Sequence, residues 1–263
     1  MSLKNILARI DSNRDSINTR RPLTSREVKE LDQYYLIGTT YSSNALEGNS
    51  LTLLETKVLL EDGITTGGKP IRDYYEASGH AEAYTHMLSA ARAQPFNISE
   101  ETILKLHRLF YRNIDDEKAG KYRDHMVFIS GTEYVPPQPQ DVPALMQEYV
   151  QEVNEKSNVL HPVLLASYAH RRLVDIHPFT DGNGRTARLI MNLILINKGY
   201  CIVSISRIWR HDYISALISA QREQKPETEP FDRFIAECEL EAQRDYARMF
   251  KIQLSKPAPE HER

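Results

Sequence analysis

Apolar side chains recur along most of the chain at helical spacing rather than with the strict alternation of a strand. Start and stop signals bound several of these segments: Thr52 and Glu55 form a capping box, Gly63 can end that helix, and Ser99 and Pro162 suit helix starts. The pattern predicts helices over residues 3–10, 24–37, 52–63, 71–93, 99–110, 141 or 143 to 153, 161–176, 184–198, 209–222 and 231–250.

Residues 126–135 break this pattern. They combine β-branched and aromatic side chains on both sides of Gly131, and prolines at positions 136, 137 and 139 exclude a helix directly after them. The segment predicts a β-hairpin that packs on the helical body, because two strands are not stable alone. We therefore expect an all-α fold, a helical bundle with a small β-hairpin flap.

Composition narrows the class of protein. The 263 residues carry 33 basic and 36 acidic side chains, a net charge of −3, which gives no basic surplus for nucleic acid. The most apolar stretch, residues 189–196, is far shorter than the roughly 20 residues of a membrane span, and the first residues lack the apolar run of a secretory signal. We expect a cytoplasmic protein with neither nucleic acid nor a membrane as partner.

The segment 177–188, between two predicted helices, gathers several groups suited to phosphate chemistry. Gly182 and Gly184 flank Asn183 and allow backbone amides to approach a ligand, at the positive end of the helix that follows. Arg185 and Arg188 lie three residues apart, on one face of that helix, and two guanidinium groups suit a polyphosphate. A Gly-Asn-Gly turn alone is usually a simple helix connection. The combination predicts an anion site, although it is not a Walker P-loop.

Two further side chains of the segment suggest what the anion site does. Asp181 is a natural Mg²⁺ ligand beside phosphates. His177 has a side chain whose ordinary pKa is close to neutral pH, so it suits a general base. A lone histidine at a helix end is more often a cap or packing residue. Together with its neighbours it predicts phosphate-ester chemistry on a nucleotide.

The segment resembles the signature of the Fic family, His-x-Phe-x-Asp/Glu-Gly-Asn-Gly-Arg-x-x-Arg, at every fixed position. The stretches at 68–77, 104–108 and 120–123 are similar to the same family, and the likeness covers residues 40–240. The resemblance implies a protein adenylyltransferase, which transfers AMP from ATP to a serine, threonine or tyrosine hydroxyl of a target protein.

The resemblance also implies a role for each residue of the loop. His177 would deprotonate the target hydroxyl, and Asp181 would hold Mg²⁺, for which Mn²⁺ can substitute. The remaining nucleotide contacts would come from Gly182, Asn183, Gly184, Arg185, Thr186 and Arg188.

Other segments receive roles from the same resemblance. A flap at 124–137 would pair with the target through Ser130, Gly131, Thr132, Glu133 and Tyr134. Tyr213 stands where relatives place a tyrosine near adenine, whereas Gln221 stands where asparagine is common, so the nucleotide preference beyond ATP stays open.

Residues 43–49 resemble the family's inhibitory signature through Ser43, Glu47 and Gly48. A carboxylate brought to Arg188 would occupy the arginine that should hold the γ-phosphate, and a small displacement of the phosphates costs orders of magnitude in rate. Taken without this context, Glu47 would be an ordinary solvated helix residue. The resemblance implies that Glu47 inhibits AMP transfer; in some relatives the same carboxylate helps to remove AMP.

The sequence leaves alternatives open. A related transferase could move UMP, phosphocholine or phosphate, and a locked domain could serve as a nucleotide-binding interaction module with little turnover. Self-modification and a homodimer are further expectations from the resemblance. The predicted organisation is an N-terminal helical arm at 1–40, the inhibitory motif at 41–50, a Fic core at 51–240 and a helix end with a tail at 241–263.

Overall fold

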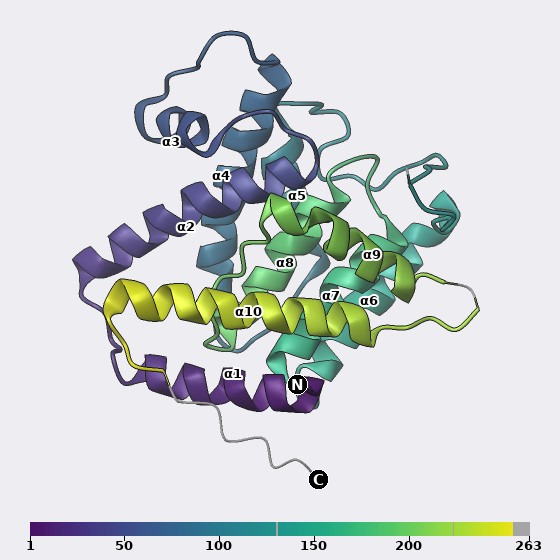
Figure 1. The fold of residues 1–263 in the computed structure, drawn as a ribbon. Helices are drawn as coiled ribbons and strands as arrows, with labels where there is room; N and C mark the ends of the chain where they lie inside the picture. The colour runs from purple at the N-terminus through teal and green to yellow at the C-terminus, as the bar shows by residue number, and fades with distance from the viewer. Residues whose placement is uncertain (130, 223, 255–263) are drawn as a thin grey trace.

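The computed structural model describes residues 1–129, 131–222 and 224–254, and within these ranges the regular structure is helical (Figure 1). The elements are α1 (Leu3–Asn18), α2 (Ser25–Leu46), α3 (Leu53–Asp62), α4 (Ile71–Ala91), α5 (Glu100–Tyr111), η1 (Pro139–Asp141), α6 (Val142–Lys156), α7 (Pro162–Ile176), α8 (Asn183–Asn197), η2 (Arg207–Trp209), α9 (Arg210–Ala220) and α10 (Glu229–Phe250). The prediction of an all-α bundle is confirmed.

Local capping signals set several of the helix ends. Thr52 and Glu55 form the expected capping box of α3, and Gly63 ends that helix in the left-handed conformation at φ 69°. The first helix is longer than predicted, because Asn13 and Ile17 continue the buried face that Ile6 and Ile10 begin. A polar residue on this face hid the continuation from the hydrophobic pattern.

The antiparallel pair α7 and α8 lies at the centre of the molecule, with α4 and α5 packed on one side and α10 on the other (Figure 1). Helices α1 and α10 run side by side along one edge, so segments far apart in sequence close the same core. Helix α2 crosses the bundle and ends beside the α7–α8 turn. None of the helices in the described ranges is both long enough and apolar enough to cross a bilayer.

The predicted hairpin is the main difference from the expected fold. Residues 124–129 and 131–137 run as irregular chain without a ladder of strand hydrogen bonds, and Ser130 lies outside the described residues. Phe128 is 84% exposed and Val135 is also exposed, so the apolar side chains that suggested strands do not cover a common core. A two-stranded ribbon without a third strand or a packed face is only marginally stable. We call the described residues 124–129 and 131–137 the flap segment.

Candidate active site

The α7–α8 turn is held rigid by its own side chains. The side-chain oxygen of Asn183 accepts a hydrogen bond from the Phe179 amide at 2.9 Å, and its amide nitrogen donates to the Phe179 carbonyl at 2.8 Å. Phe179 is fully buried, and its ring stacks on His107 with centroids 3.7 Å apart. Gly182 has a φ of 81°, which favours glycine, and a Cβ there would lie 2.8 Å from the Phe110 ring. The loop therefore has little freedom to rearrange.

His107 on α5 contacts this turn through the Phe179 ring and the Asp181 carbonyl. The sequence prediction did not assign it a role. Its Nδ1 accepts from the Gly120 amide at 2.9 Å, so Nε2 carries the hydrogen and donates to the Asp181 carbonyl at 3.0 Å. Burial lowers the pKa of His107 to about 4, which keeps the ring neutral and its tautomer fixed. A signal was present: His107 shares the apolar face of its helix with Ile103 and Phe110.

His177 follows the last residue of α7 in the left-handed conformation, at φ 50°. Its Nδ1 lies 3.2 Å from the Val174 carbonyl, which can only accept, so the hydrogen sits on Nδ1 and Nε2 keeps its lone pair. Burial lowers the pKa of His177 further than the hydrogen bond to Val174 raises it. The imidazole is thus neutral near pH 7 and can accept a proton at Nε2.

Arg188 on α8 is only 3% exposed and is surrounded by oxygen acceptors. Its guanidinium donates to the Glu47 carboxylate at 2.7 Å, to the Ser43 hydroxyl at 2.9 Å, to the Ser43 carbonyl at 2.8 Å and to the Tyr213 hydroxyl at 3.2 Å. Burial would raise the pKa of Glu47, but the charges of Arg188 and Arg185 outweigh it and lower that pKa. The structure therefore brings together the three residues of the predicted pairing: Ser43, Glu47 and Arg188.

The position of the Glu47 carboxylate coincides with the predicted anion site. Glu47 caps the C-terminus of α2, and Gly48 follows it at φ 96°. A Cβ added to Gly184 would lie 2.5 Å from Glu47 Oε1 and 3.1 Å from Arg188 Nη1. The absence of a side chain at Gly184 is what lets an anionic group reach the first turn of α8. In this structure that group is the carboxylate of the protein itself.

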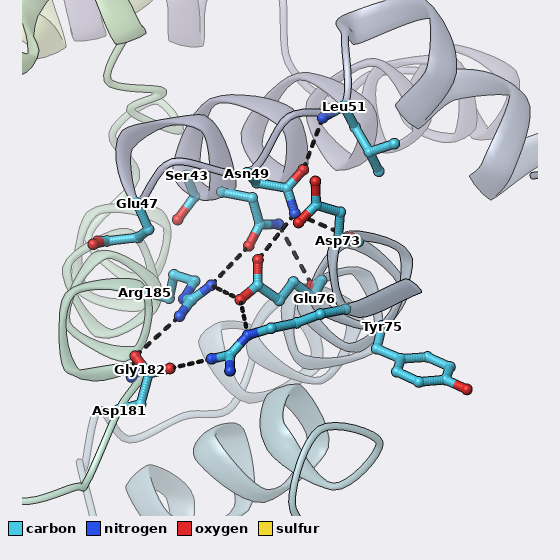
Figure 2. A network of polar contacts seen from close by, with 12 residues as sticks. Ser43, Glu47, Asn49, Leu51, Asp73, Tyr75, Glu76, Asp181, Gly182 and Arg185 are labelled. Carbon is cyan, nitrogen blue, oxygen red and sulfur yellow. Dashed lines mark hydrogen bonds and ion pairs between the residues drawn. The ribbon is translucent and has the colours of Figure 1, made fainter. Parts of the chain in front are cut away.

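Asp181 and Arg185 belong to a second network that reaches α4 (Figure 2). Arg185 donates to Asp181 at 3.2 Å and forms an ion pair with Glu76 at 3.1 Å. Arg72 also binds both carboxylates, at 2.6 Å from Asp181 and 3.1 Å from Glu76. The sequence prediction missed Arg72 and Glu76, which come from α4. Asp181 is the partly exposed carboxylate of this network, and no cluster of three metal-ligating side chains occurs among the described residues.

The predicted adenine contacts are both engaged within the protein. The Tyr213 hydroxyl is buried and lies between Arg188 and His170 Nε2, which is 3.0 Å away. Gln221 donates to the Asp175 carboxylate at 2.9 Å. The predicted contact Thr186 is fully buried within α8. Tyr213 thus supports an arginine of the anion site, and the roles of Gln221 and Thr186 in nucleotide binding stay predictions.

A hollow of about 810 Å³ lies between the flap segment and α9, close to the end of α7. Its lining consists of Gly131, Thr132, Glu133, Tyr134, Ile218, Gln221, Arg222 and Gln224. The Tyr134 hydroxyl donates to the Asp175 carbonyl at 2.9 Å, two residues before His177. Four of the predicted flap residues therefore border an open hollow, and one of them, Tyr134, also contacts the last turn of α7.

Comparisons with known proteins agree with this site. A sequence profile of the Fic/DOC family matches residues 97–195. The protein adenylyltransferase Fic of Drosophila persimilis is 38% identical over 235 residues, 88% of this chain and 44% of that protein. The protein adenylyltransferase Fic of Nematostella vectensis is 36% identical over 234 residues, 89% of this chain and 53% of that protein. The chain thus spans about half the length of these curated relatives.

Among solved structures, a fragment of Fic-1 from C. elegans superposes with a TM-score of 0.85 at 30% identity, covering 95% of this chain and 73% of that one. The fold, the helix-terminal loop 177–188 and these similarities lead to one conclusion. The chain belongs to the Fic/DOC family.

Proposed function

We propose that this chain is a protein adenylyltransferase, which transfers AMP from ATP to a hydroxyl side chain of a target protein. The observation that carries the proposal is the neutral His177, with a free Nε2, beside a glycine-lined helix N-terminus that has two buried arginines. The name that the curated relatives share supports the same activity.

In the proposed reaction the target hydroxyl gives its proton to Nε2 of His177 and its oxygen forms a bond to the α-phosphorus of ATP. The bond between that phosphorus and the bridging oxygen breaks, and pyrophosphate leaves with the electron pair. The free amides at the start of α8 and the guanidinium groups of Arg185 and Arg188 stabilise the negative charge on the phosphates. The ring can accept the proton because it starts neutral, with the lone pair of Nε2 free.

The residues present fit a magnesium ion that Asp181 would hold. Asp181 has an accessible carboxylate next to the anion site, and Mg²⁺ usually takes one or two carboxylates together with substrate phosphates. When bound there, Mg²⁺ would neutralise phosphate charge, and Mn²⁺ can take its place. The carboxylate must first part from Arg72 and Arg185, which hold both of its oxygens.

Glu47 would act as an inhibitor of this reaction. Its carboxylate takes the guanidinium of Arg188 and lies against Gly184, where the phosphates of ATP would otherwise bind. ATP that binds beside it must place its phosphates elsewhere, and even a small misplacement of the reacting phosphorus slows the chemistry strongly. The same carboxylate could orient a water for removal of AMP from a modified target.

Two kinds of protein partner fit the surface. The flap segment would add an extended stretch of the target as a strand, and an exposed hydroxyl of this chain would be the acceptor in self-modification. Exposed apolar side chains on α3 and at the start of α4 suit a homodimer contact; they are Leu53, Leu54, Ile71 and Tyr75.

The test is labelling with ATP that carries a tag on the α-phosphate side, in the presence of Mg²⁺. We expect Glu47→Gly to label itself or added proteins at least tenfold faster than wild type, and Glu47→Gly/His177→Ala to show no label. Glu61→Gly is the matched control, because Glu61 also lies near a helix C-terminus but pairs only with surface groups. No labelling by Glu47→Gly would refute AMP transfer, and tagged UTP or CDP-choline would then test the alternative transferases.

Removal of AMP is tested on target that has first been labelled by Glu47→Gly. Wild type should release AMP from it, whereas Glu47→Gln should not, because the amide lacks the negative charge that would orient and polarise a water. No release by wild type with Mg²⁺ or Mn²⁺ would count against this second activity.

A further inference from the structure

Arg123 is a buried cation without a carboxylate partner. The residue is 3% exposed, and no acidic side chain of the described chain lies within ion-pair distance of it. Burying a charge without a counter-ion costs free energy unless its donors are all satisfied. The arrangement of its donors therefore shows what the residue does.

Each of the three guanidinium nitrogens reaches a different backbone carbonyl. Nε donates to His177 at 2.8 Å, Nη1 donates to His125 at 3.1 Å, and Nη2 donates to Pro137 at 2.6 Å. The backbone amide of Arg123 adds a bond to the Pro178 carbonyl at 2.9 Å. His125 and Pro137 lie near the two ends of the flap segment, so one side chain joins both ends to the residue that carries the candidate base.

A second contact joins the flap segment to the same place. The Tyr134 hydroxyl donates to the Asp175 carbonyl, and the neighbouring Val174 carbonyl accepts from the His177 ring. In the last turn of α7, the Asp175 carbonyl therefore binds the flap segment and the adjacent Val174 carbonyl orients the imidazole. These contacts fix the flap segment and His177 relative to one another.

We propose that Arg123 is a positioning residue that sets the distance and angle between the base His177 and the flap segment, so that a hydroxyl presented on the flap arrives at Nε2. The proposal rests on the proposed function for its chemical purpose. Lysine has one terminal donor group and cannot reach three carbonyls in a fixed fork, so the geometry requires arginine.

The charge of Arg123 has a further effect on His177. Burial has the largest effect on the pKa of His177 and lowers it. Among the charged groups around the ring, Arg123 also lowers this pKa, whereas Glu47 and Asp181 raise it. Removing the Arg123 charge should raise the pKa of His177, whereas replacement by lysine should leave it near the wild-type value. A purely structural role would predict no such difference between the two variants.

The test compares wild type, Arg123→Gln, Arg123→Lys and the control Arg26→Gln, whose side chain is 87% exposed and pairs with Glu30 in the first turns of α2. The His177 ring resonance, assigned by its loss in His177→Ala, is titrated by NMR. Cleavage of the flap segment by a dilute protease is timed in parallel. We expect a higher pKa only in Arg123→Gln, and at least tenfold faster cleavage in both Arg123 variants. The proposal is wrong if Arg123→Gln has the same His177 pKa and the same rate of flap cleavage as wild type.

These readouts do not require AMP transfer, so they separate the two proposals. If Glu47→Gly fails to label, the proposed function fails, and the titration still decides the role of Arg123. If Arg123→Gln does not fold, the wild-type protein can be used to test the proposal by NMR. The Arg123 Nε resonance, assigned by its loss in Arg123→Lys, should shift as His177 titrates, and an unchanged resonance would overturn the proposal.

Discussion

Replacing Glu47 by glutamine should lower the free energy of unfolding of the ligand-free protein and raise its affinity for ATP. Arg188 is almost fully buried, while the Glu47 side chain is 37% exposed and 2.7 Å from it. Breaking a fully buried pair costs about 3–5 kcal/mol, and an exposed pair is worth about 0–1 kcal/mol. Because the Glu47 carboxylate is partly exposed, the loss from breaking this pair should lie between these two values, at about 2 kcal/mol. Arg188 keeps its hydrogen bonds to Ser43 and Tyr213 in the variant.

This estimate can be checked by two independent measurements. A loss of about 2 kcal/mol lowers the melting temperature of a chain of this size by roughly 4–8 °C. If phosphates replace the carboxylate on Arg188, a non-hydrolysable ATP analogue should bind the variant up to about 30-fold more tightly than it binds wild type, by calorimetry. Glu61→Gln is the control and should change neither quantity.

Glu47→Gln that melts several degrees lower but binds the analogue with wild-type affinity would mean that the pair stabilises the fold without competing with phosphate. Equal melting temperatures and equal affinities would mean that the 2.7 Å pair contributes nothing to either.

Three further predictions concern other groups. Burial raises the pKa of Glu239 from 4.5 to about 8, so the free energy of unfolding falls as the pH rises through this range. In urea unfolding, Glu239→Gln should reduce the fall in this free energy between about pH 6 and pH 9 by about 2–3 kcal/mol. Arg72→Gln frees one oxygen of Asp181 and should tighten Mn²⁺ binding several-fold, measured by electron paramagnetic resonance with the ATP analogue; unchanged or weaker binding contradicts this. Tyr213→Phe removes a hydroxyl from buried Arg188 and should lower the free energy of unfolding by about 1–2 kcal/mol.

The helix ends and the loop 177–188 were predictable because their signals are local. The capping box at Thr52 and the glycine stop at Gly63 act within a few residues, and the loop 177–188 carries its groups in one short segment. The pairing of Glu47 with Arg188 was predicted only through the family resemblance, since nothing local in either segment indicates that they meet.

The remainder depends on contacts between distant segments. Arg72 reaches Asp181 and Glu76 reaches Arg185 from a helix about a hundred residues earlier. Arg123 reaches three carbonyls that no sequence pattern marks. The hairpin prediction was wrong for the opposite reason: β-branched and aromatic residues indicated strands, but among the described residues no third strand supports them. Composition alone cannot show what a segment packs against.

The clamp that Asn183 forms on Phe179 also bears on the chemical lifetime of the protein. An asparagine followed by glycine, as in Asn183-Gly184, is prone to spontaneous deamidation in a free loop, since the glycine nitrogen can attack the side-chain carbonyl. Here both ends of the Asn183 amide are held by the Phe179 backbone, the side chain is buried, and Gly184 is already part of α8. Without this clamp, ageing would place a new carboxylate at the start of the helix and repel the phosphates that it should bind.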